Sequence, residues 1–206
     1  MTLTPLMTRN GLIHLESLPE TALTAAALGE TLAKNNRYVG RTAEPWSVAA
    51  HSVLVSRLCP HKKEQAWGLL HDAHEAFIGD IITPAVTFIA NQSRPVAGTI
   101  VERCVRSAKA DLDRQICAAW GIDPAMVDLE EVGQYDRIAL EAEMFFFFDA
   151  IPDGWCRDHD RALNHLRGLP VTGNWQAGMM LWVSEAERLA HLGACRRPTP
   201  ETNQAA

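Results

Sequence analysis

The stretch AWGLLHDAHEAF, residues 66–77, governs how the rest of the chain is interpreted. It begins as an apolar helix and then places His71, Asp72, His74 and Glu75 where the apolar run should continue. A lone His-Asp dipeptide is ordinarily a pair on a helix surface. Apolar residues flank this pair, so its face is expected inside, where a buried carboxylate needs a partner such as a metal ion. We therefore interpret His71 and Asp72 as candidate metal ligands.

Length and charge limit the class of protein. The 206 residues predict one domain over 1–206, large enough to bury a core without disulfides. The formal net charge of -6 disfavours duplex DNA and similar polyanions, because binding their backbones needs a broad basic surface. We therefore expect no nucleic acid polymer as a partner. A small phosphorylated ligand stays compatible, since a few arginines can bind it.

Cysteine usage and hydropathy predict a cytoplasmic protein. The five cysteines are scattered without a C-x-x-C pair, which fits free thiols in a reducing compartment better than disulfides or a zinc framework. Residues 1–30 resemble no signal peptide, and no apolar run reaches the length of a membrane span. No membrane contact is expected. The apolar run Phe145–Phe148 is expected in a core or a subunit contact.

Helical spacing of apolar residues dominates the chain, and strand signals are almost absent, so we predict an all-α fold. An extended segment with a turn at Gly11 comes first. Ser47 is expected to cap a helix, and Gly79 to end one with a left-handed residue. Helices are predicted over 20–35, 47–60, 62–77, 94–120, 124–149 (one helix or a pair) and 174–192, with 85–93 a short helix or a loop.

Other helices must supply the remaining ligands. His51 lies on an apolar stripe between Val48 and Val55, where the alternative is a hydrogen-bonded core histidine. Asp136 is the second candidate, and its alternative is a salt bridge to Arg137 or another base. Two His and two Asp would form a mixed nitrogen and oxygen site suited to Mn, Fe, Co, Ni or Zn.

Acidic residues beside the candidate ligands suggest hydrolytic chemistry. Glu75 follows His71 by one helical turn, so it can act as a general acid or base near the ion. Asp80 lies beyond the helix end and can act from the other side. The alternative for Glu75 is a solvated residue or a partner of Lys63 or Arg41.

The loop at 37–46 carries candidate substrate contacts. Arg37 and Arg41 have planar guanidinium groups that match phosphate oxygens. Tyr38 or Trp46 can stack on a base, and simple packing explains either equally well.

Several short motifs recur in the order found in one known family. These are NRY (36–38), SVAAHSVL (47–54), LHDAHEAFIGDI (70–81) and TP (83–84), with an aspartate at 136. Over residues 10–150 the chain resembles the HD superfamily of metal-dependent phosphohydrolases, in its bacterial and phage 5'-deoxynucleotidase branch. The resemblance implies a helical bundle that holds one divalent metal at His51, His71, Asp72 and Asp136.

The resemblance also implies roles around that metal. Glu75 and Asp80 would be the catalytic acids near the attacked phosphate, with Arg37 at the phosphate and Tyr38 by the base or sugar. His74 stands where relatives commonly carry a small hydroxyl residue. We expect it to point outward, and the alternatives are a partner of Glu75 or an extra proton donor.

The expected activity is hydrolysis of a 2'-deoxyribonucleoside 5'-monophosphate to nucleoside and phosphate. Alternatives are a triphosphohydrolase acting on dNTPs, a phosphodiesterase acting on cyclic or linear dinucleotides, and a nucleotide-binding protein without catalysis. The resemblance further implies a homodimer or a larger homo-oligomer, with Phe145–Phe148 or the helix around Trp175–Trp182 as the contact.

Overall fold

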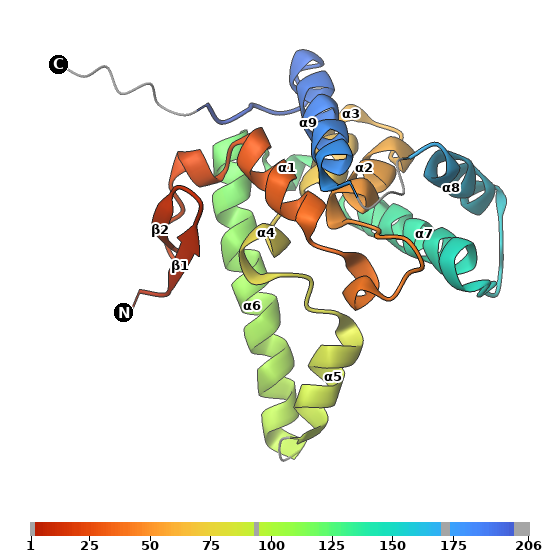
Figure 1. Ribbon diagram of the computed structural model, residues 1–206, viewed down its shortest axis with the longest axis horizontal. Helices are drawn as coiled ribbons and strands as arrows, with labels where there is room; N and C mark the ends of the chain where they lie inside the picture. The colour runs from red at the N-terminus through yellow and green to blue at the C-terminus, as the bar shows by residue number, and fades with distance from the viewer. Residues whose placement is uncertain (1–2, 93–94, 170–173, 200–206) are drawn as a thin grey trace.

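A computed structural model describes residues 3–92, 95–169 and 174–199. Helices make up most of the described chain, so the predicted all-α fold is confirmed. Figure 1 shows these helices and the small N-terminal hairpin. The α-helices are α1 (Ala25–Lys34), α2 (Val48–Leu58), α3 (Lys62–Leu70), α4 (Glu75–Ile78), α5 (Thr83–Gln92), α6 (Pro95–Trp120), α7 (Leu129–Phe148), α8 (Arg157–Arg167) and α9 (Trp175–His191).

Short elements complete the chain. Strands β1 (Pro5–Thr8) and β2 (Gly11–His14) pair antiparallel, with Thr8 opposite Gly11. Gly11 has φ 115°, which a side chain would disfavour, so the predicted turn at this residue is confirmed. One-turn 3-10 helices lie at Glu20–Ala22, Arg37–Gly40 and Pro124–Met126.

Helix α2 is the centre of the core. It packs against α1, α3, α7, α8 and α9, and all its residues from Val48 to Ser56 are buried. Ser47 caps the helix as predicted, because its hydroxyl accepts a hydrogen bond from the Ala50 N–H at 3.2 Å. A polar residue on α2 therefore has to find its partners inside the protein.

Aromatic packing joins the end of α6 to α9 within this core. Trp120 and Trp182 are fully buried, and their rings meet edge to face at 5.7 Å. The Trp120 indole N–H donates to the Leu23 carbonyl at 3.0 Å. Figure 1 shows α9 lying across α1 and α2, while α5 and the far end of α6 project from the rest of the bundle.

The helix predicted over 62–77 is wrong in its middle. Helix α3 ends at Leu70 and α4 begins at Glu75, with turns between them. Here the N–H groups of Ala73, Glu75 and Ala76 bond to carbonyls three residues back, so the backbone is wound more tightly than an α-helix. Gly79 ends α4 with φ 74° and ψ 168°, a positive φ but not the predicted left-handed helical geometry.

Most of the other predicted boundaries hold. Helices α2, α6 and α9 match the predicted ranges closely, and 124–149 contains one long helix, α7, but in 20–35 a 3-10 turn comes first and α1 begins only at Ala25. Helix α8 was not predicted. Phe147 packs against the core, whereas Phe146 and Phe148 are 39% and 44% exposed. The oligomeric state stays a prediction.

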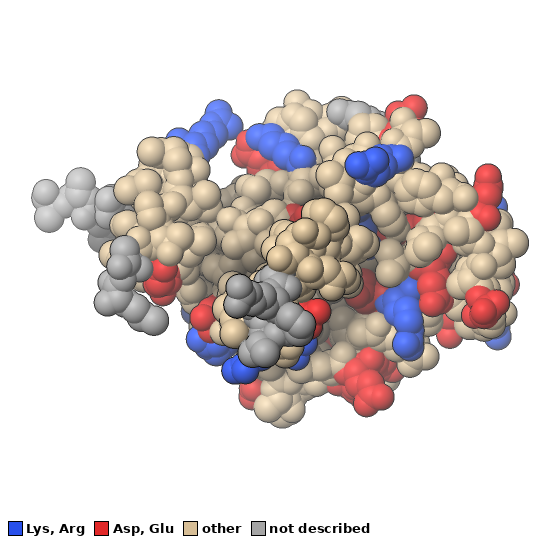
Figure 2. All heavy atoms as spheres, turned by 90° about the horizontal axis from the view of Figure 1, so that it is seen from below, with Lys and Arg blue, Asp and Glu red and all other residues tan. Residues whose placement is uncertain are grey.

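Two further surface properties bear on partners. No helix in the described parts of the chain is long and apolar enough to cross a membrane. On the face drawn in Figure 2, acidic and basic side chains are interspersed among neutral ones.

The close approach of α2 and α3 depends on Gly68. A Cβ atom at this position would lie 3.2 Å from the backbone N and Cα of Ser56. We expect Gly68→Ala to push α3 away from α2 and to destabilise the protein by about 1–3 kcal/mol. Gly133→Ala on α7 is the matched control, since nothing lies within 4 Å of its added Cβ. It should be neutral or stabilising by about 0.5–1 kcal/mol. Denaturant unfolding of both variants tests this, and equal midpoints would contradict it.

Candidate metal centre

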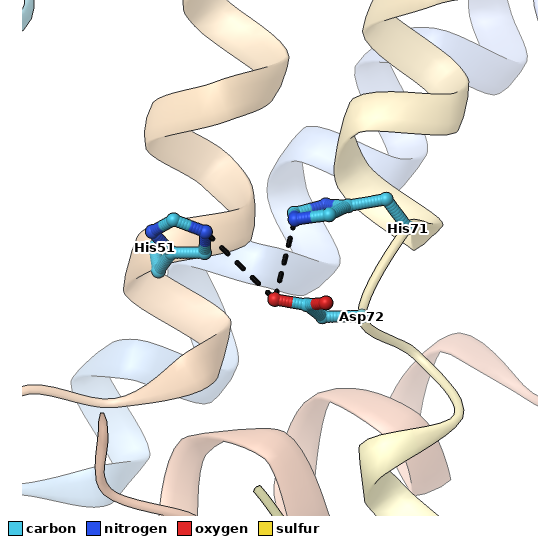
Figure 3. A group of neighbouring side chains, drawn as sticks. All are labelled: His51, His71 and Asp72. Atoms are coloured by element: carbon cyan, nitrogen blue, oxygen red, sulfur yellow. Dashed lines mark ion pairs between the residues drawn. The ribbon is translucent and has the colours of Figure 1, made fainter. Parts of the chain in front are cut away.

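Helices α2 and α7 and the turn after α3 bring together the four residues predicted as metal ligands. His51 comes from the middle of α2, His71 and Asp72 from the turn after α3, and Asp136 from α7. Figure 3 shows His51 and His71 directed at the Asp72 carboxylate. Packing of α2 against α3 buries His51 and most of His71, whereas 41% of the Asp136 side chain is exposed. The cluster is therefore open to solvent on the α7 side.

The spacing of the donor atoms fits a metal ion. His51 Nε2 lies 3.0 Å from Asp136 Oδ1 and 3.8 Å from Asp72 Oδ2. His71 Nε2 lies 3.2 Å from Asp72 Oδ2 and 3.6 Å from Asp136 Oδ1. Bonds of about 2.1 Å place neighbouring ligands about 3.0 Å apart around an octahedral ion and about 3.4 Å apart around a tetrahedral one. The observed separations span both values.

Hydrogen bonds fix both imidazoles in the tautomer that metal binding requires. His51 Nδ1 lies 2.6 Å from the Glu143 carboxylate, and His71 Nδ1 lies 2.8 Å from the Gly68 carbonyl. Because both partners are acceptors, each Nδ1 carries a hydrogen, so each Nε2 is the nitrogen that faces the carboxylates. Without a cation, His51 Nε2 donates a hydrogen bond to Asp136 Oδ1 at 3.0 Å, and a metal ion would take the place of that proton. His71 Nε2 is buried without a hydrogen-bond partner. Such an atom fits the donor set of a metal.

Glu143 contacts the cluster, although the sequence patterns did not predict it there. Its carboxylate is fully buried and accepts hydrogen bonds from His51, Arg37 Nε at 3.0 Å and Tyr38 Oη at 2.9 Å. Burial alone would raise its pKa, but Arg37 and His51 outweigh burial and lower the pKa to about 2. A signal was present, because Glu143 follows Asp136 by two turns and lies on the same face of α7.

The charges of the cluster are mutually dependent. Burial by itself would raise the pKa of Asp72 and of Asp136, but the neighbouring histidines lower both values. Burial and Arg37 tend to lower the pKa of His51, but Glu143 and Asp136 outweigh them and raise it. Asp72 and Asp136 likewise overcome burial and raise the pKa of His71 well above its ordinary value. A divalent cation has to displace these imidazole protons, so its binding will release protons and weaken at acidic pH.

Arg37 and Tyr38 lie beside the cluster, as the predicted substrate contacts should. Arg37 Nη1 is 3.7 Å from Asp72 Oδ2, and the Tyr38 ring meets Phe148 edge to face at 5.2 Å. Tyr38 and Val39 have φ values of 56° and 55°, which are strained for residues with side chains. Both polar groups already bind Glu143, so their contact with a substrate stays a prediction.

The other two predicted substrate contacts, Trp46 and Arg41, are placed differently from Arg37 and Tyr38. Trp46 has no exposed surface and packs against Phe147 at 5.5 Å, so in this structure its ring is closed to a base. Arg41 is exposed, and in the described part of the chain no ion pair joins it to the cluster. Arg41 therefore lies apart from the cluster, whereas the buried Trp46 indole lies on the Glu143 side of it and helps to lower the pKa of that carboxylate.

The surroundings of Glu75 and Asp80 raise the pKa values of both carboxyl groups. The Glu75 side chain is buried, its Oε2 has no hydrogen-bond partner, and Lys109 Nζ lies 3.8 Å from its Oε1. Burial first, then the charges of Asp72 and Asp80, raises the pKa of Glu75 to about 8. Burial also raises the pKa of the half-buried Asp80. Glu75 can therefore hold a proton near neutral pH, as a general acid must.

The expectation that His74 points outward is wrong. Only 4% of the residue is exposed, and its Nδ1 lies 2.9 Å from Asp113 Oδ1 on α6. Its Nε2 is buried without a hydrogen-bond partner. The tight turn after α3 and the contact with α6 draw this side chain inward. One donor atom each from Asp72, His74 and Glu75 lies within 4.8 Å of the others, which makes a second group able to hold a cation.

No protein-family model and no curated protein matches this chain. The resemblance to the HD phosphohydrolases therefore stays a prediction that depends on the residues themselves. What the geometry adds is a cluster of two histidines and two aspartates, contributed by segments far apart in the sequence.

The hydrogen bond from His51 to Glu143 should control metal affinity. We expect Glu143→Gln to weaken binding of Mn²⁺ or Co²⁺ by about 10- to 100-fold, because the charged partner that orients His51 is lost. Glu141→Gln on the same helix is the matched control, since Glu141 binds His159 instead. Isothermal titration calorimetry measures both affinities, and circular dichroism checks the fold. Equal affinities in the two variants would contradict this role of Glu143.

Burial of Glu75 should make the metal-free protein less stable in base. Its pKa is about 8 in the folded chain against an ordinary value of 4.5, so folding favours the protonated form. That contribution is complete below the lower value and is lost as the pH rises through the upper one. Glu75→Gln should therefore stabilise the chain relative to wild type at about pH 9 but not at about pH 4. Denaturant unfolding at both pH values tests this, with exposed Glu102→Gln as a control that should show no such difference.

Proposed function

We propose that this chain is a metal-dependent phosphohydrolase of the HD type, acting on 2'-deoxyribonucleoside 5'-monophosphates. The observation that carries the proposal is the convergence of His51, His71, Asp72 and Asp136, with both Nε2 atoms facing the two carboxylates. Chance packing rarely leaves a buried imidazole nitrogen without a hydrogen-bond partner while two carboxylate oxygens lie 3.2 and 3.6 Å away, as for His71 Nε2 here.

The donor set suits Mn, Fe, Co, Ni or Zn, held by the two imidazoles and the two carboxylates. When bound, such an ion lowers the pKa of a water molecule and polarises a phosphoryl oxygen. The exposed side of Asp136 leaves room for a substrate to approach the cluster.

The surrounding residues would bind the phosphate and transfer protons. Arg37 places a permanent positive charge 3.7 Å from Asp72, where it can balance a phosphate. Glu143 holds that guanidinium in place through Nε. Glu75 can give a proton to the leaving 5'-oxygen, because its pKa is raised to about 8. Asp80 is the second carboxyl group available for proton transfer.

One observation favours a second candidate function. The donor group formed by Asp72, His74 and Glu75 adjoins the first cluster through the shared Asp72. Two neighbouring ions would suit hydrolysis of a phosphodiester such as a cyclic or linear dinucleotide. In that case Glu75 would bind a cation, and Asp80 would be left to handle protons.

An assay combined with elemental analysis tests the proposal. The metal-stripped protein is reloaded with Mn²⁺ or Co²⁺ and given all deoxymononucleotides, together with dNTPs and dinucleotides. We expect phosphate release from at least one monophosphate. Tripolyphosphate would identify a triphosphohydrolase, and mononucleotides from a dinucleotide would identify a diesterase. Turnover of no substrate would overturn the proposal.

A matched pair of variants links activity to the cluster. Asp72→Ala should abolish both metal content and activity, because it removes a ligand that contacts both histidines. Asp111→Ala should keep both, since this aspartate is exposed on α6 and pairs with Arg114. Metal retained by the Asp72 variant would place the site elsewhere.

A further inference from the structure

A cysteine, a histidine and a glutamate form a second cluster, separate from the metal centre. Cys156 is exposed and lies just before α8, with its Sγ 3.1 Å from His159 Nδ1. On the other side of the ring, His159 Nε2 lies 2.6 Å from Glu141 Oε2 on α7. We infer that Cys156 is an activated thiol, with His159 as its base and Glu141 as the residue that positions the histidine, and that it exchanges with small zwitterionic disulfides.

The histidine is held firmly in this arrangement. Its ring is 5% exposed and stacks on Trp155, with centroids 4.9 Å apart and an interplanar angle of 29°. Because a carboxylate can only accept, Nε2 carries the hydrogen, and the Nδ1 lone pair faces both the Cys156 backbone N–H, which donates to it at 3.1 Å, and the Cys156 Sγ at 3.1 Å. This is the geometry of a nucleophile, a base and an orienting group in sequence.

Local electrostatics favour the thiolate. The backbone N–H groups of Asp158 and His159, at the start of α8, point at Sγ and lower the pKa of Cys156, and the His159 side chain adds to them. Burial tends to lower the pKa of His159, but Glu141 and Cys156 raise it above its ordinary value. Cys156 is exposed, so a co-reactant can reach the sulfur.

A pocket on α8 suggests what that co-reactant is. It has a volume of about 450 Å³, and one of its lining residues, Asp160, accepts a hydrogen bond from the Trp155 indole that stacks on His159. Its lining carries charges of both signs and an amide, namely Arg157, Asp158, Asp160, Arg161 and Asn164. Carboxylates would pair with the guanidinium groups and an ammonium with the aspartates. Disulfides of amino acids or short peptides carry both kinds of group.

The reaction is balanced without a further oxidant. The Cys156 thiol gives its proton to His159 Nδ1, and the thiolate attacks one sulfur of the disulfide. A new S–S bond forms to Cys156, and the original S–S bond breaks. The other half leaves as a thiolate and takes the proton back from His159. One disulfide and one thiol thus yield one mixed disulfide and one thiol.

A purely structural role for His159 makes a different prediction. The Cys156 N–H donates to His159 Nδ1 at 3.1 Å, so the pair also forms a capping box at the start of α8. Glutamine is a usual residue at this third helical position of a capping box. His159→Gln therefore preserves the cap while removing the imidazole. A capping residue alone leaves Cys156 reactivity unchanged in this variant.

The test follows modification of individual cysteines by mass spectrometry of peptides. The reduced full chain is treated near neutral pH with glutathione disulfide or with uncharged 2-hydroxyethyl disulfide. Cys104 is the internal control, because it is exposed on α6 and has no imidazole partner among the described residues. We expect Cys156 to react with glutathione disulfide about fivefold faster than Cys104.

The variants separate the parts of the inference. His159→Gln should slow Cys156 to about the rate of Cys104 with no loss of α8 stability by circular dichroism. Arg157→Gln should reduce the preference of Cys156 for glutathione disulfide over the uncharged disulfide. An unchanged rate in the His159 variant, or Cys156 no faster than Cys104 in wild type, would overturn the activated thiol. Equal rates with both disulfides in wild type would overturn the zwitterionic co-reactant.

Discussion

The hydrogen bond between the buried Glu143 carboxylate and His51 is the contact on which the metal centre depends. A fully buried charge is costly unless donors replace its water, and here His51, Arg37 and Tyr38 do so. The carboxylate thereby ties α7 to α2 and to the segment after α1. It also fixes the hydrogen of His51 on Nδ1, which leaves Nε2 free to face the two aspartates.

The break between α3 and α4 brings the acidic residues to the same place. In a regular α-helix, successive side chains diverge by about 100°. The tighter winding after Leu70 has about three residues per turn, so Asp72 and Glu75, three residues apart, come to lie on the same side of the chain, with donor atoms within 4.8 Å of each other. The consequence is a buried carboxyl oxygen without a hydrogen-bond partner. Such an arrangement works against stability and is common where a protein performs chemistry.

Two glutamates of helix α7 each bind and orient a histidine of another segment. Glu143 binds one ring nitrogen of His51 and leaves the other for the aspartate cluster. Glu141, two residues earlier, binds one ring nitrogen of His159 and leaves the other for Cys156. In both places a carboxylate selects the tautomer of a histidine, so its second nitrogen can act on a neighbouring group. One helix thus supports two chemically different clusters.

Patterns local in the chain determined the fold class and the candidate ligands. Apolar residues recurring at helical spacing gave an all-α fold, and His51 on such a stripe had to lie inside. Tertiary structure decided what periodicity does not encode. It turned His74 inward against Asp113, closed Trp46 into the core and left Arg41 exposed. It also paired Glu143 with His51, and Glu141 with His159. These outcomes depend on contacts between helices distant in sequence, whose relative placement is set by the packing of the whole core.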